Sequence, residues 1–230
     1  MQGKWDPASP EETQVETALF GRITPYTRIV HSLRRLQMHV AAKCHIGLPQ
    51  DALYRINSTK SLLNKPADFW SDTIVLYAET LPKMDQALAE WIPQNPAEQY
   101  ARAALESVVT NVRAALALMQ FSQSRTAYRQ AAIAQFTDPA SYCERLAEME
   151  EVLGTAVQSM KTSRKVKEDS IANTGITRQD LLWQDRVIAY LLSLQEKLQK
   201  FQQDSLSMVS LPCFTEFLYS WEFGEDGLVP

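Results

Sequence analysis

The feature that most constrains this chain is a repeated helix-start signal, in which a polar capping residue is followed at once by proline. The signal occurs at Ser9-Pro10, Thr24-Pro25, Asn95-Pro96 and Asp138-Pro139. The polar side chain can accept hydrogen bonds from the first helical turn, and proline at the first position lacks an N–H that would otherwise have no partner. Glutamates three residues after the first and third caps complete capping boxes. The signal therefore predicts a chain divided into helices that begin at these prolines.

The strongest periodicity follows the last of these starts. Apolar residues recur there at alternating steps of four and three: Tyr142, Leu146, Met149, Leu153, Ala156 and Met160. We call this row the α-seam, because such spacing is typical of coiled-coil packing. A second apolar row occupies residues 178–208, and Asn173-Thr174-Gly175 predicts a turn within 169–177. These patterns predict an antiparallel helical hairpin in which Leu146, Leu153, Ile188 and Leu198 are buried.

The rest of the chain also has helical spacing. Helices are predicted at about 10–22, 25–45, 50–63 and 66–91, and from 96 to beyond 120. Pro82 predicts a bend or break, and the polar Ser122-Gln123-Ser124 leaves room for a second break. No run alternates strictly between apolar and polar residues, so no sheet is predicted. The predicted fold class is all-α: a bundle of about six to eight helices, several of them long, with helix above about 65% of residues.

The C-terminal end differs from the rest in charge and composition. The last basic residue is Lys200, and five of the chain's 27 acidic residues follow it, so residues 1–200 are almost neutral. We predict a single helical domain over 1–211 and an acidic aromatic tail over 212–230. A helix in the tail would place Phe214, Phe217 and Trp221 on one face, flanked by Glu216 and Glu222. These five residues are the predicted partner-binding site, although the tail could instead pack on its own bundle.

Candidate catalytic and metal-binding residues are few. His31, His39 and His45 are eight and six residues apart, which does not place them on one helical face as metal-binding pairs require. The acidic row Glu144, Glu148 and Glu151 is most simply a solvated helix face. Nucleophile elbows, phosphate loops and Cys-x-x-Cys pairs are absent. We therefore predict no catalytic residue, no cofactor and no metal site.

Two features leave nucleic-acid binding open as an alternative. The basic cluster Lys161, Arg164, Lys165 and Lys167 could contact phosphate, or could only mark the C-terminal end of a helix, where cations are favoured. The string Asn95-Pro96-Ala97-Glu98-Gln99-Tyr100-Ala101-Arg102 resembles a helix start of translin-family proteins, which implies an all-helical nucleic-acid-binding protein. The resemblance covers fewer than ten residues and the chain's body is not basic, so we do not adopt it.

The expected function is that of a helical-bundle interaction module, such as an adaptor, a regulator or a subunit of a complex. Its partner would be another protein or a second copy of the chain. The alternatives are an all-α enzyme with a site assembled from dispersed residues and a helical nucleic-acid-binding protein. Three scattered cysteines and the lack of an apolar leader or a membrane-length apolar run predict a cytoplasmic protein.

Overall fold

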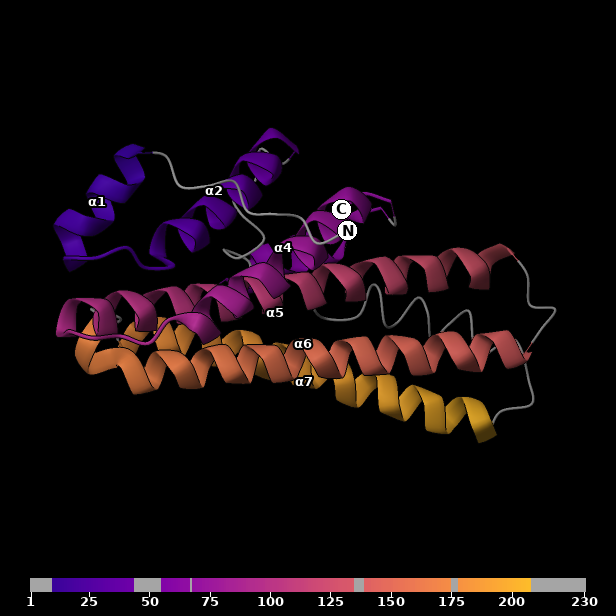
Figure 1. Ribbon diagram of the computed structural model, residues 1–230. Helices are drawn as coiled ribbons and strands as arrows, with labels where there is room; N and C mark the ends of the chain where they lie inside the picture. The colour runs from indigo at the N-terminus through magenta and orange to yellow at the C-terminus, as the bar shows by residue number, and fades with distance from the viewer. Residues whose placement is uncertain (1–9, 44–54, 67, 135–138, 175–177, 208–230) are drawn as a thin grey trace.

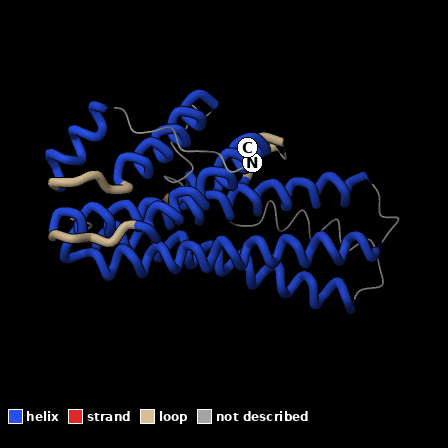
Figure 2. The backbone as a smooth tube through the Cα atoms, viewed as in Figure 1, coloured by secondary structure: helices blue, strands red, loops and turns tan. Residues whose placement is uncertain are grey.

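The computed structural model describes residues 10–43, 55–66, 68–134, 139–174 and 178–207. These ranges hold seven helices and no strand. Figure 2 shows the helices and the loops that join them. The helices are α1 (Pro10–Phe20), α2 (Tyr26–Lys43), α3 (Ile56–Leu63), α4 (Ser71–Glu90), α5 (Pro96–Ala134), α6 (Pro139–Thr174) and α7 (Arg178–Ser207). The all-α prediction is confirmed, and the helices account for more than the predicted 65% of the chain. None of the described helices is both long enough and apolar enough to cross a membrane.

The three longest helices, α5, α6 and α7, lie side by side and alternate in direction (Figure 1). Contacts between α6 and α7 give the register directly. Near one end Gln199 donates to Glu150 at 2.9 Å, and further along Arg164 donates to Asp185 at 2.6 Å. The paired residue rises from 150 to 164 on α6 as its partner falls from 199 to 185 on α7. The two helices are therefore antiparallel, and the predicted hairpin is confirmed. α6 continues to Thr174, so its connection to α7 is shorter than the sequence predicted.

The α-seam faces the core as predicted. Its described members from Leu146 to Met160 are all at most 2% exposed. Leu153, Ile188 and Leu198, which complete the set predicted to be buried, are between 0% and 8% exposed. These side chains belong to one continuous hydrophobic cluster that also includes residues of α2, α3, α4 and α5. The burial of this apolar surface is the main contribution to the stability of the hairpin.

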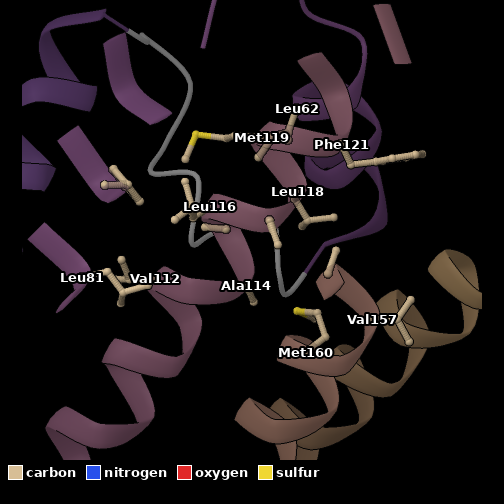
Figure 3. Packing of buried hydrophobic residues seen from close by; sticks show 14 of the residues in the cluster. Leu62, Leu81, Val112, Ala114, Leu116, Leu118, Met119, Phe121, Val157 and Met160 are labelled. Carbon is tan, nitrogen blue, oxygen red and sulfur yellow. The ribbon is translucent and has the colours of Figure 1, made fainter. Parts of the chain in front are cut away.

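α5 is the central helix of the molecule. It packs against α4 and α3 on one side and against α6 on the other. Figure 3 shows Val112 beside Leu81 of α4, whereas Ala114 lies toward Met160 of α6. Because α5 has neighbours on opposite sides, residues Ala114–Met119 are all at most 9% exposed. This part of α5 is therefore apolar on all sides rather than amphipathic.

The break that Ser122–Ser124 left open in α5 does not occur. Ser122 is buried and its hydroxyl donates to the carbonyl oxygens of Leu62 and Leu63, at 3.2 and 3.1 Å. The last carbonyls of a helix have no partner within that helix, so these bonds cap the C-terminal end of α3. Ser122 therefore interrupts the apolar pattern of α5 because its hydroxyl binds the end of α3. α4 likewise runs through Pro82 without a break.

We expect Ser122→Ala to lower the free energy of unfolding by about 1 kcal/mol, because the hydroxyl hydrogen that the two carbonyls share is lost. The Leu62 carbonyl keeps the indole N–H of Trp70 as a donor, at 3.1 Å. Chemical denaturation monitored by circular dichroism measures the change. Ser193→Ala is a control on α7, since that hydroxyl bonds only within its own helix, to the carbonyl of Tyr190. Equal stability of Ser122→Ala and wild type would show that the hydroxyl does not cap α3.

A buried glutamate joins the α4–α5 turn to the segment between α1 and α2. Both carboxylate oxygens of Glu98 accept from Arg22, at 3.0 and 2.6 Å, and the indole N–H of Trp91 donates to it at 3.1 Å. Half of the predicted capping box at Asn95 is present, with the Glu98 N–H donating to Asn95 Oδ1 at 2.9 Å. In the other half, the Glu98 carboxylate accepts from the backbone N–H of Gln94, at 3.3 Å. The hydrogen bond from Arg22 lowers the pKa of Glu98 to about 2. This carboxylate is therefore ionised and holds two distant segments together.

A second buried carboxylate fixes α1 to the start of α2. Glu16 is 2% exposed and accepts from the backbone N–H groups of Thr24 and Thr27, both at 2.6 Å, and from the Thr27 hydroxyl. These N–H groups lie at the N-terminal end of α2, where a carboxylate is favoured by the helix dipole. This polar contact is one of the anchors of α1.

Candidate functional site

A closed circuit of polar side chains lies within the core, between α5, α6 and α7. Lys167 donates to Asn111 Oδ1 at 3.1 Å and to Gln184 Oε1 at 3.0 Å. Gln184 Nε2 donates to Ser163 Oγ at 3.0 Å, and the Ser163 hydroxyl donates to Asn111 Oδ1. All four side chains are at most 6% exposed. We call these four residues the core polar circuit.

The core polar circuit continues the α-seam. Ser163 and Lys167 follow Met160 by three and then four residues, which is the step of the seam itself. Gln184 follows the buried Leu181 by three residues and precedes the buried Ile188 by four. The heptad spacing therefore indicates that these polar residues lie in the core. The prediction from the sequence did not include this circuit, because Lys167 is adjacent along the chain to other basic residues.

The environment of Lys167 is polar but closed to water. Burial lowers the pKa of its ammonium group to about 8, while the charge of Asp180 acts in the opposite direction. At 3% exposure, the ammonium is out of reach of a substrate unless the helices separate. A polar set at core positions of packed helices can specify their register, since any shift would leave its members without partners.

The members of the basic cluster that the sequence suggested as a phosphate contact lie in different surroundings. Lys167 faces the core, and Arg164 is paired with Asp185 and Glu168. Lys161 and Lys165 are exposed. Only part of the cluster therefore faces solvent without an acidic neighbour in contact, which weakens its case as a phosphate-binding site.

The outer face of α2 is the most basic surface of any described helix. α2 contains three arginines, one lysine and two histidines but no acidic residue. An open hollow of about 370 Å³ lies on this face, lined among the described residues by His31, Arg34, Arg35 and Met38. His31 is paired with Glu12 of α1. Within the described ranges, Arg34 and Arg35 are in contact with no acidic residue.

The other candidate groups do not form a site. His39 lies within 3.4 Å of the Thr73 hydroxyl on α4, whereas His45 is outside the described residues. Glu144, Glu148 and Glu151 are exposed on α6, as expected for a solvated helix face. In the part of the chain that is described, no three His, Cys, Asp or Glu residues are grouped so as to hold a metal ion.

α1 carries an apolar row on its outer side. Val15 and Leu19 are four residues apart on α1, and Ile23 follows in the segment between α1 and α2. All three are more than half exposed, at 53%, 55% and 62%. The side of α1 that faces the bundle carries Glu16 instead. We call these three residues the α1 outer row. Large apolar side chains that recur on one exposed helix face are typical of a contact surface.

The predicted partner-binding residues Phe214, Glu216, Phe217, Trp221 and Glu222 lie outside the described residues, as does the whole predicted tail over 212–230. They remain a prediction from the sequence. Comparisons of the chain with models of protein families, with curated proteins and with solved structures found no match.

Proposed function

We propose that this protein is an interaction module that binds another protein through the α1 outer row. The observation that carries the proposal is the outward orientation of Val15 and Leu19 on a helix whose inner side is held by a buried carboxylate. Because these two side chains are only about half exposed, burying the rest of their surface against a partner would contribute about 1.5–3 kcal/mol before the entropy of association is subtracted.

The attachment of α1 suits this role. Glu16 binds the start of α2, and Phe20 packs edge-on against Tyr26 and Trp91, with ring centroids 5.4 and 6.1 Å apart. These contacts hold the helix in one orientation, so the outer row is presented without a folding step upon binding. A surface ordered in advance loses less entropy when a partner binds. A partner with an apolar groove or an amphipathic helix has the complementary chemistry.

The experiment is a quantitative binding assay with the full chain as bait. Val15→Glu combined with Leu19→Glu should reduce retention of a specific partner, or dimerisation measured by light scattering, by at least about tenfold. Leu182→Glu is the matched control, since Leu182 is an equally exposed leucine, at 61%, on α7. Circular dichroism should show the same melting temperature for all variants, because the changed side chains face solvent.

A partner or dimer that is retained equally by wild type and the Val15/Leu19 double variant would contradict this proposal. The enzyme alternative has less support, because the most unusual ionisable group, Lys167, is enclosed by three helices. The nucleic-acid alternative has less support because its basic cluster is divided between the core, an ion pair and solvent.

A further inference from the structure

We infer that the outer face of α2 binds the acidic, aromatic C-terminal segment of the same chain, residues 212–226. The contact is intramolecular and uses a surface separate from the α1 outer row. It would place the carboxylates of the segment against Arg34 and Arg35, and its aromatic side chains against Met38. The inference therefore goes beyond the proposed function and does not depend on it.

Charge complementarity is the first argument. α2 holds four Lys or Arg residues and no acid, in a chain whose net charge is −4. Residues 212–226 contain Glu216, Glu222, Glu225 and Asp226 and no basic residue. Arg28 and His31 already have acidic neighbours in Glu90 and Glu12, but Arg34 and Arg35 have none among the described residues. The two arginines and the acidic segment therefore carry complementary charges.

The shape and polarity of the α2 face give the second argument. All the described residues that line the hollow of about 370 Å³ belong to α2. No other described helix therefore forms its opposite wall. Met38 is 64% exposed at this position, beside the two arginines. An apolar floor with a basic rim is the complement of a segment that alternates aromatic and acidic residues. Arginine can also stack on aromatic rings and pair with carboxylates in two hydrogen bonds.

Chain length allows the contact. α7 ends at Ser207, at the end of the bundle where α5 also ends (Figure 1). α5, with 39 residues, is about 58 Å long at 1.5 Å per residue. The four residues 208–211 join Ser207 to the segment and span about 13 Å when extended. The 15 residues of the segment span up to about 50 Å more, so its later residues reach furthest along the bundle. Tethering also raises the local concentration of the segment to the millimolar range, so a weak contact suffices.

The test measures intramolecular cross-linking in the full chain. Cys44→Ser and Cys143→Ser leave Cys213 as the reporter at the start of the segment. Met38→Cys adds a second thiol on the α2 face, and Val75→Cys, at a similarly exposed position on α4, is the matched control. A short bismaleimide should join Cys213 to the thiol at position 38 at least about fivefold more efficiently than to the thiol at position 75. Peptide mass spectrometry on the monomer fraction measures both yields.

Charge reversal identifies the cause of the contact. Arg34→Glu with Arg35→Glu should reduce the yield at position 38 by about fivefold to tenfold, and added salt should reduce it in wild type. Glu216→Lys with Glu222→Lys in the reversed chain should restore it. If the reversal lowers the melting temperature, Arg34→Gln with Arg35→Gln replaces it, and a smaller decrease is expected.

Three results would overturn the inference. The first is an equal yield at positions 38 and 75, which would mean that the segment does not select α2. The second is a yield that charge reversal leaves unchanged. The third is a cross-linked product that is dimeric, which would assign the α2 face to the segment of a second copy.

Discussion

Leu153→Ala is expected to lower the free energy of unfolding by about 2–5 kcal/mol, the range for truncating a buried leucine in a packed core. Leu153 is fully buried in the middle of the α-seam. The substitution removes apolar contacts and leaves a cavity between helices that cannot close without shifting their register. Urea denaturation followed by circular dichroism measures the loss, provided that the transition is two-state.

Leu182→Ala is the control for this prediction. Leu182 is on α7 but is 61% exposed, so its truncation should change the free energy of unfolding by less than about 0.5 kcal/mol. A loss of under about 0.5 kcal/mol for Leu153→Ala as well would show that this part of the α-seam faces solvent. The pairing of α6 with its neighbours would then be wrong.

The core polar circuit should give the protein an unusual dependence of stability on alkaline pH. Lys167 has a pKa of about 8 when folded, against 10.5 for an unperturbed lysine. Between these values the unfolded chain holds one more proton than the folded chain at this site, so stability rises with pH. The free-energy cost of burying the charged ammonium lowers the stability in full below pH 8 and no longer contributes above pH 10.5. The two pKa values correspond to a change of about 3 kcal/mol.

Lys167→Met removes this titration. Free energies of unfolding are measured from about pH 7.5 to about pH 10.5 in wild type and variant, and the difference between the two proteins should shift by about 3 kcal/mol in favour of wild type. Other groups that ionise in this range cancel in the difference. Lys161→Met, at an exposed position of the same helix, is the control for replacing a lysine by methionine. Parallel pH profiles for wild type and Lys167→Met would mean that Lys167 is charged in the folded protein over the whole range.

Helix positions were predictable because their signals are local. The capping residue and proline that begin α5 act within one turn, and the bond from the Glu98 N–H to Asn95 confirms that the sequence signal has its expected geometry. The step of four and three in the α-seam likewise depends only on the helical repeat. Helix ends were less predictable. α6 extends to Thr174, through a stretch that its polar composition had assigned to a turn.

Two errors of interpretation came from side chains whose partners are distant in the chain. Ser122 looked like a helix break, but its hydroxyl binds the end of α3, about sixty residues earlier. Lys167 looked like part of a solvent-facing basic cluster, but its ammonium binds Asn111 and Gln184 on two other helices. In both cases a polar residue within an apolar pattern was satisfied by a neighbouring helix.

The all-α class, the starts of the long helices and the apolar face of the hairpin were predictable from the chain alone, since each depends on spacing within one segment. Which polar residues are buried and which apolar residues are exposed depends on contacts between segments. Glu16 is buried because its carboxylate caps another helix, whereas Val15 and Leu19 of the same helix are more than half exposed. The orientation of a short helix follows from contacts with segments remote along the chain, and its own periodicity cannot show which face those contacts will cover.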